Sequence, residues 1–436
     1  MHNLRRIVTM LLKFQVTNHR SIRATAEISF VATSLKEQSE SLVPCPYTKH
    51  GVLPVLALYG ANASGKSNLL DGMAFFRRTI LRSFVEGDTE SGMVQRPFLL
   101  DDESRKQAST YIADFVLNGV KHQYGFSITS ERVVEEWLYQ FPKIARQILF
   151  FRKAGEETKF FYGRNLKGKN REVEAITRSN ALFLSAAMKA GHVELLPIAK
   201  YFKDFIQFRL SSGSDSAQIL GEILKTDAIL KNEITKYLGI TDTGITEIDV
   251  VANEFSASER DFINEISNTF EIFSDIDLKK IKPLEHRFNI NLKHNSEDGN
   301  LRSLNFDDES LGTQYFISIL VPMLDVLKKG KLLVLDEITT SLHTLLARKL
   351  VTLFMDTNIN TKGAQLLFST HDTNLLAPGL LRRDQVWFAE KSVNTSETVI
   401  YPLTDIKTKN TDNIERGYIQ GRFGGIPFIP DNQPLC

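Results

Sequence analysis

An α/β fold is predicted for this chain of 436 residues, and three observations predict it. An apolar run, VLPVLALY, leads into the glycine-rich octapeptide GANASGKS and then into a helical pattern. A second apolar run, LLVLDE, ends in two carboxylates far along the chain. Between the two, alternating runs predict an antiparallel β-meander, and residues 172–238 have helical spacing. We therefore expect an α/β core with an N-terminal meander and a mostly helical insertion.

The composition is that of a soluble globular protein, with 42% hydrophobic and 24% charged residues. The 53 Lys and Arg nearly balance the 52 Asp and Glu, so no global charge points to a nucleic-acid or membrane partner, although a local basic groove would not show in that total. The two cysteines form no zinc or redox pattern. The run YFISILVPMLDVL is too short to span a bilayer and contains Pro322 and Asp325. A cytoplasmic location without membrane contact is expected.

The N-terminal half is expected to be rich in strands. Leu11–Val16 and Ala26–Ala32 alternate and predict a hairpin, and Val52–Tyr59 predicts a buried strand. From Asn68 onward, apolar residues recur on one face of a helix. The meander is expected in four runs between residues 114 and 150: ADFVLNGV, HQYGFSIT, EEWLYQF and ARQILFF.

The second half is expected to alternate again after the helical segment. Ile245–Val251 and Phe288–Leu292 predict strands, and Ala257–Phe270 predicts a helix. A helix to about Leu327 follows the loop FDDESLGT, and SLHTLLARKLVTLFMDT predicts another. The last strands are expected in LLVLDE, AQLLFST, VWFAEKS and ETVIYPL. The expected division is a first lobe at 10–180, a mostly helical insertion at 181–300 and a second lobe at 301–436.

The octapeptide Gly60–Ser67 matches the phosphate-binding consensus G-x-x-x-x-G-K-[ST] at every fixed position. Its place between a strand and a helix lets loop N–H groups and the helix N-terminus surround a triphosphate. Lys66 is expected to reach the β- and γ-phosphates and Ser67 to ligate Mg²⁺. A chance match in a glycine-rich turn is the alternative, and these flanks disfavour it. The expected ATP-binding residues are Gly60, Ala61, Asn62, Ala63, Ser64, Gly65, Lys66, Ser67 and Asn68.

Two later strand ends carry the side chains that hydrolysis needs. Asp336 is expected to hold Mg²⁺, and Glu337 to polarise the attacking water. His371, after the run AQLLFST, is expected to hydrogen-bond the γ-phosphate or that water. The acidic pair alone also suits a strand that ends in solvent, and His371 alone also suits an ordinary loop histidine. Combined with the phosphate-binding loop, they predict an ATPase with Lys66, Glu337 and His371 as catalytic residues.

The stretch FDDESLGTQYFISIL supports two compatible interpretations. Ser310 suits the N-cap of a buried helix, with Asp308 and Glu309 near the positive end of the helix dipole. Gly312 lets backbone approach a ligand closely. The same helix N-terminus could also donate to a phosphate held by a second molecule.

These residues resemble the ABC-type ATPases of the SMC/RecF group, and more closely the stand-alone bacterial ATPases of the AbiEii/RloA-like group, which includes the OLD ATPase domains. The resemblance covers nearly the whole chain. It rests on LLKFQVTNHRSI, ALYGANASGKSNLL, PFLLDDES, NGVKHQYGFSI, ERVVEEWLY, TRSNALFLS, ESLGT, LLVLDEI, SLH, FSTHD and YIQGRFGGIPFI.

The resemblance implies a role for each matching residue. It makes Asp336-Glu337 the Walker B pair, His371 the switch histidine and residues 341–343 the D-loop. It places ESLGT at the signature position, where Ser310 and Gly312 face the γ-phosphate bound by the opposite subunit. It implies that Asn18 and Arg20 approach the nucleotide, although His19 stands where an aromatic residue is usual. Gln95 is the candidate Q-loop glutamine and Mg²⁺ ligand.

The resemblance also implies a homodimer or higher homo-oligomer with ATP at shared interfaces. Members of this group often serve anti-phage or abortive-infection systems beside a separate nuclease or toxin effector. OLD proteins continue into a Toprim nuclease, but the 65 residues after His371 are too few for that domain. The alternatives are a RecF/SMC-like repair ATPase with a nucleic-acid partner, a transporter motor, and a scaffold that binds nucleotide without turnover. The sequence shows no membrane segments, which disfavours the transporter motor. Residues 172–238 show neither sustained heptads nor strong positive charge, which disfavours the repair ATPase.

Overall fold

The computed structural model describes residues 9–86, 92–155, 159–209, 216–241, 243–254 and 286–426. The chain forms two compact units. The first consists of Met1–Leu210, Val326–Thr339 and Thr344–Cys436, and the second of Ser211–Asp325 and Thr340–His343. The expected boundary at residue 181 therefore falls inside the first unit.

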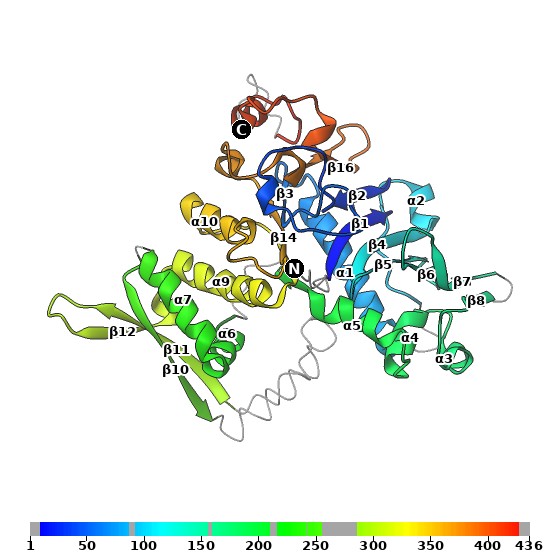
Figure 1. Ribbon diagram of the computed structural model, residues 1–436, viewed down its shortest axis with the longest axis horizontal. Coiled ribbons are helices and arrows are strands. Elements are labelled where there is room, and N and C mark those ends of the chain that lie inside the picture. Colours follow the sequence, from blue (N-terminus) through cyan, green and yellow to red (C-terminus); the bar gives the residue numbers. More distant parts are fainter. Residues whose placement is uncertain are drawn as a thin grey trace, which may run out of the picture. The chain divides into compact units, whose positions relative to one another are not determined.

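A six-stranded sheet is the centre of the first unit, with strand order β16-β15-β3-β14-β13-β9. Its strands β16, β3 and β14 are labelled in Figure 1. Neighbouring strands from β15 to β9 are parallel, and β16 is antiparallel at one edge. The inner strands are buried on both faces, which explains their continuous apolar sequences. The strands are β3 (Val55–Tyr59), β9 (Ile206–Arg209), β13 (Leu332–Leu335), β14 (Gln365–Thr370), β15 (Val386–Lys391) and β16 (Thr398–Pro402).

An antiparallel seven-stranded sheet, ordered β2-β1-β4-β5-β6-β7-β8, completes the framework of this unit. Asn118 and Gly119 both have positive φ (51° and 77°) and join β4 to β5 in the two-residue turn that this dipeptide favours. The strands are β1 (Met10–Thr17), β2 (Ala26–Ser29), β4 (Ser109–Leu117), β5 (Val120–Ile128), β6 (Val133–Phe141), β7 (Gln147–Lys153) and β8 (Lys159–Tyr162).

Helix α1 (Lys66–Glu86) contributes a buried apolar face to the core of the first unit. The Phe76 ring packs edge-on against Phe14 and Phe202 and stacks on Phe126 of β5, with centroids 5.4 Å apart. The helix that carries the phosphate-binding loop is therefore anchored to the meander. The other helices of this unit are α2 (Asp102–Lys106), α3 (Asn170–Ile176), α4 (Phe183–Lys189), α5 (Leu196–Phe205), α10 (Thr344–Met355) and α11 (Ile414–Ile419), with 3₁₀ turns η1 (Ser39–Ser41), η3 (Thr373–Leu376), η4 (Arg383–Gln385) and η5 (Leu403–Asp405).

The second unit is built on a three-stranded antiparallel sheet, β10-β11-β12. Helix α6 (Ser216–Thr226) packs on β11 (His286–Asn295), and α7 (Ala228–Ile240) packs on β10 (Ile245–Glu254) (Figure 1). After β12 (Leu301–Asn305) and η2 (Phe306–Asp308), α9 (Leu311–Lys329) begins in this unit. In the part of the chain that the structure describes, α9 has the length and hydropathy of a membrane span; 56% of the segment is buried, and core helices of soluble proteins pass the same test.

The structure confirms most of the expected elements. The N-terminal hairpin, the meander and the strands of the parallel sheet all form. The strands β8, β9 and β12 were not expected, and α10 begins at Thr344 rather than at Ser341. The expected helix Ala257–Phe270 lies outside the described residues.

Candidate functional site

The loop between β3 and α1 has a path that two of its glycines permit. A Cβ on Gly60 would lie 2.4 Å from the Ala389 carbonyl oxygen, and a Cβ on Gly65 would lie 2.0 Å from Thr398 Oγ1. Gly65 also has φ 101°, in the region that favours glycine. The glycine spacing therefore follows from contacts that larger residues would prevent.

Lys66 starts α1 and is directed back into this loop. Its Nζ donates to the carbonyl oxygens of Gly60 (2.7 Å) and Ala61 (3.1 Å), and the residue is only 7% exposed. Burial lowers the pKa of Lys66, while the negative charges of Glu337 and Asp336 act in the opposite direction. The two carboxylates are thus near enough to influence the lysine.

The loop fits a triphosphate. The buried Ser64 Oγ has no hydrogen-bond partner among the described residues, and Lys66 Nζ is held by loop carbonyls that phosphate oxygens can replace. Ser67 is exposed in the first turn of α1, where a hydroxyl can reach a bound cation. Asn68 donates to Ser21 Oγ at 2.6 Å and thereby ties the helix start to the β1–β2 connection.

Thr398 at the start of β16 braces the loop, and sequence reasoning missed it. Its Oγ1 donates to the Ser64 carbonyl oxygen at 2.8 Å and lies 2.7 Å from Ser21 Oγ, while its N–H donates to the Ser21 carbonyl oxygen. The residue is 4% exposed. No local pattern marks it, because 334 positions separate it from its partner.

Thr398→Val is expected to weaken ATP binding about 5–10-fold, because it keeps the shape of the side chain but removes a buried hydrogen bond of about 1 kcal/mol. Thr395→Val, on the exposed neighbouring turn, is the matched control. Isothermal titration calorimetry with a non-hydrolysable ATP analogue measures the difference. Equal affinities for the two variants would show that Thr398 does not hold the loop.

The acidic pair lies at the carboxyl edge of the same sheet. β13 and β3 both run parallel to β14, so their carboxyl ends meet at one edge, where ligands bind in such sheets. Ser369 Oγ donates to Asp336 Oδ1 at 2.5 Å and accepts from the Glu337 N–H at 2.8 Å. One hydroxyl of β14 therefore fixes both acidic residues.

Glu337 and His371 contact each other. His371 Nδ1 lies 3.1 Å from Glu337 Oε1, and Thr339 Oγ1 donates to the same oxygen at 3.1 Å. Glu337 has φ 56°, an unusual conformation for a residue with a Cβ that is found where a site constrains the backbone. The side chains are 27% and 62% exposed, so solvent reaches the pair. A carboxylate and an imidazole arranged in this way can accept and orient a water proton.

The β1–β2 connection brings Arg20 and His19 into contact with Asp71 of α1. Arg20 Nε and His19 Nε2 both contact Asp71 Oδ2, at 2.5 and 2.9 Å, and Arg96 also binds this carboxylate. Burial would raise the pKa of Asp71, but the His19 hydrogen bond and the two guanidinium groups hold it well below its usual range. Burial lowers the pKa of His19, whose other nitrogen meets Tyr111. His19 thus replaces the usual aromatic residue with a buried polar contact.

Asn18 and Gln95 make contacts away from the phosphate-binding loop. Asn18 Nδ2 donates to the Ser104 carbonyl oxygen, and its Oδ1 accepts from the Phe98 N–H. Gln95 Nε2 donates to the Gln107 carbonyl oxygen at 2.9 Å. These bonds hold the segment around Gln95 beside the β1–β2 connection. The roles of Arg20 and Gln95 toward nucleotide and Mg²⁺ stay predictions.

In the second unit, Ser310 is the cap of α9. Its Oγ accepts from the Thr313 N–H at 3.1 Å, and the residue is exposed. A Cβ on Gly312 would lie 2.9 Å from the Ser341 carbonyl oxygen, so the signature-like loop and the D-loop-like segment approach closely. Glu309 Oε1 is engaged by His294 at 2.5 Å. The helix N-terminus is accessible, and its action on a second molecule stays a prediction.

A bound cation would be held mainly by the nucleotide. Over the described ranges, no group of three or more His, Cys, Asp and Glu side chains is placed to hold a metal ion. Mg²⁺ in nucleotide sites is bound by one or two protein ligands together with phosphate oxygens and water. The Ser67 hydroxyl and the Asp336 carboxylate are of the right chemistry.

The parallel sheet, the loop that follows β3 and the carboxylates that follow β13 define a P-loop ATPase. Residues 55–180 and 192–377 match the family model described as "AAA domain, putative AbiEii toxin, Type IV TA system". The chain belongs to this AbiEii-like AAA ATPase family.

Among solved structures, the chain is similar to the SMC head domain from Thermotoga maritima. The identity is 12%, the TM-score is 0.40, and the match covers 90% of this chain and 98% of that one. A comparison with curated proteins found no match.

Proposed function

We propose that the protein is a cytoplasmic, Mg²⁺-dependent ABC-type ATPase that dimerises or oligomerises on ATP and controls a separate nuclease or toxin effector in anti-phage defence. The family description, which names an AbiEii toxin and a type IV toxin–antitoxin system, supports this role. The observation that carries the ATP-driven assembly is the exposed, Ser310-capped N-terminus of the 19-residue helix α9, which can donate to an anion.

The proposed cycle assigns a task to each side chain. Lys66 holds the β- and γ-phosphates, and Ser67 and Asp336 would hold Mg²⁺, which would neutralise phosphate charge. Glu337 accepts a proton from the water that attacks the γ-phosphorus, and His371 orients Glu337 and this water. ATP and water thereby give ADP and phosphate. Ser310 and Gly312 of a second molecule complete the site, and hydrolysis releases the assembly.

Ser310→Arg tests the assembly step. The arginine removes the cap and blocks the helix N-terminus, so ATP-driven dimerisation should disappear and hydrolysis should fall about 100-fold or more, while ATP binding by the monomer persists. Light scattering with and without ATP and a phosphate-release assay measure these results. Ser303→Arg, at an exposed position on β12, is the control. Loss of monomer ATP binding would instead assign Ser310 a structural role.

A second candidate is a RecF/SMC-like ATPase that binds nucleic acid. A hollow on the first unit favours it, because the described residues that line it include Lys49, Lys121, Lys143, Lys329 and Lys362 but no Asp or Glu. The candidates differ in what copurifies with the native protein: an effector protein supports the first, and nucleic acid alone supports the second.

A further inference from the structure

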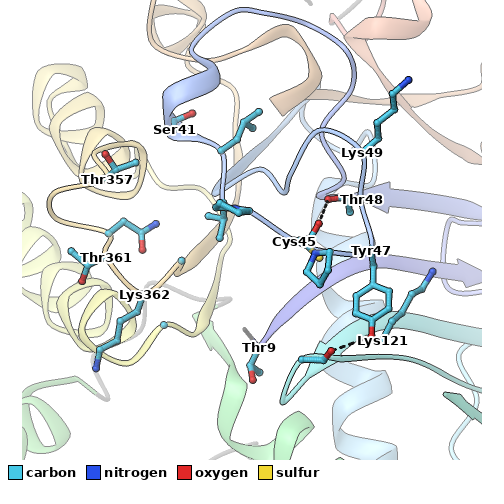
Figure 2. Close-up of a pocket in the computed structure, with 18 of the residues that line it drawn as sticks. Thr9, Ser41, Cys45, Tyr47, Thr48, Lys49, Lys121, Thr357, Thr361 and Lys362 are labelled. Atoms are coloured by element: carbon cyan, nitrogen blue, oxygen red, sulfur yellow. Dashed lines mark hydrogen bonds between the residues drawn. The ribbon is translucent and has the colours of Figure 1, made fainter. Parts of the chain in front are cut away.

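A hollow of about 1860 Å³ lies on the first unit, away from the phosphate-binding loop (Figure 2). The turns that precede β13 and β14, at Lys329–Gly330 and Lys362–Gly363, line it. These turns precede their strands, so the hollow is at the amino edge of the sheet. The loop Gly60–Ser67 follows β3, which runs parallel to β14, so this loop is at the opposite, carboxyl edge. Its occupant therefore differs from the nucleotide.

The charge of the hollow departs from that of the whole chain. Of the 24 described residues that line it, none is Asp or Glu, although acidic and basic residues balance in the full sequence. Lys121 pairs at 3.2 Å with Asp114, which does not line the hollow. The lining lysines are Lys49, Lys121, Lys143, Lys329 and Lys362.

Three of these lysines leave positive charge uncompensated. Lys49, Lys143 and Lys362 are exposed, and none of them forms an ion pair with another residue in the described ranges. In Figure 2, Thr357, Thr361 and Lys362 stand on one side of the hollow and Tyr47, Thr48 and Lys49 on the other. Positive charge and hydroxyl groups on both walls suit a chain of phosphates, which lysine, serine and threonine commonly contact.

The hollow also offers ring faces and apolar surface. The Tyr47 hydroxyl donates to the Gly119 carbonyl oxygen at 3.1 Å, which fixes its ring, and Phe141 lies beneath the Lys121 ammonium at 5.1 Å. Ile144 is 95% exposed at the rim. Aromatic faces beside a basic groove are the arrangement on which unpaired bases stack.

We propose that this hollow binds single-stranded nucleic acid without sequence preference. Its volume exceeds the roughly 300–1,000 Å³ of small-molecule sites. No arginine lines it among the described residues, and lysine acts as a point charge rather than as a reader of base edges. Two occupants could match the positive charge: a flexible nucleic-acid strand and an acidic protein surface. The strand fits better, because its bases can stack on the aromatic rings of the groove and an acidic protein surface cannot. The proposal does not depend on the proposed effector or on hydrolysis.

The test measures binding of a fluorescent oligothymidine of about 25 nucleotides to the full chain by polarisation over a salt series. Lys49→Glu/Lys143→Glu/Lys362→Glu should lower the slope of log affinity against log salt by about 2, because each lost phosphate contact removes about 0.7 from a single-strand slope. Low-salt affinity should fall at least about 100-fold. The affinity and the salt slope of Lys49→Gln/Lys143→Gln/Lys362→Gln should lie between those of the wild type and those of the triple glutamate variant. This variant keeps the test valid if charge reversal impairs folding.

Lys167→Glu/Lys189→Glu/Lys200→Glu changes three exposed lysines that do not line the hollow and should bind like the wild type. Three results would overturn the proposal: no binding by the wild type, equal loss in both triple variants, or binding of polyglutamate but not of oligothymidine. Phosphate release by the hollow variant should stay at the wild-type rate. Failure of the nucleic-acid proposal and failure of the ATPase proposal are therefore distinguishable.

Discussion

Glu337→Gln is expected to bind ATP normally and to release phosphate about 10²–10⁴-fold more slowly than the wild type, the range for loss of a positioned general base. The amide keeps the size of the side chain and can still accept from Thr339 Oγ1 and His371 Nδ1, which contact Glu337 at 3.1 Å. It cannot take up a proton from water. The ATP-bound assembly should therefore accumulate.

The measurement is single-turnover phosphate release, with ATP affinity determined separately. Glu390→Gln, at an exposed carboxylate on β15 of the same sheet, is the control and should hydrolyse ATP at the wild-type rate. Wild-type phosphate release by Glu337→Gln would refute its role as the base. Loss of ATP affinity would mean that this carboxylate supports the fold of the loop instead.

Arg152→Met is expected to lower the free energy of unfolding by about 3–5 kcal/mol, because it leaves a buried carboxylate without its cation. Arg152 and Glu136 are 1% and 0% exposed, and Arg152 Nη1 is 3.6 Å from Glu136 Oε2. The guanidinium also donates to the carbonyl oxygens of Ala181 and Arg178, while Glu136 accepts the N–H groups at the start of α4. The pair thus joins the meander to α4.

Lys153→Met, one residue along β7, provides the comparison. Lys153 is 62% exposed and pairs with Glu135 at the surface, so its loss should cost at most about 1 kcal/mol. Urea unfolding measures both variants. Burial raises the pKa of Glu136, and removing Arg152 raises it further. A group with a raised folded pKa loses stability as pH rises, so the Arg152→Met defect should be larger at about pH 8 than at about pH 5. If Arg152→Met and Lys153→Met lost the same free energy of unfolding, the argument that the buried ion pair stabilises the fold would be contradicted.

The residues predictable from sequence are those whose signal is local. GANASGKS between a strand and a helix, and LLVLDE as a buried strand with two acids, indicated the class of protein and the position of its loop. The Asn118-Gly119 turn likewise indicated the hairpin of β4 and β5. Turn chemistry and hydrophobic periodicity act over a few residues, so these elements could be identified from the chain alone.

The unexpected features depend on distant partners. β9 is four residues long and continues directly from α5, so only its pairing with β13 shows it to be a strand. Ser369 was part of an expected strand, but its bonds to Asp336 and Glu337 span more than 30 positions. His19 and Asp71 form a polar contact that the usual aromatic residue would not make. The expected role of Ser310 is tested by Ser310→Arg, and the roles of Arg20 and Gln95 toward the nucleotide stay predictions.

The strand order has a consequence for the protein during its own synthesis. β3 is made early, yet its two neighbours in the sheet, β14 and β15, leave the ribosome roughly 300 residues later. At a translation rate of roughly 5–20 residues per second, the strand that precedes the phosphate-binding loop waits about 15–60 s for its neighbours. A nascent chain therefore cannot assemble a competent nucleotide site until β14 and β15 have been made, and a product truncated before these strands would carry the loop without a working ATPase.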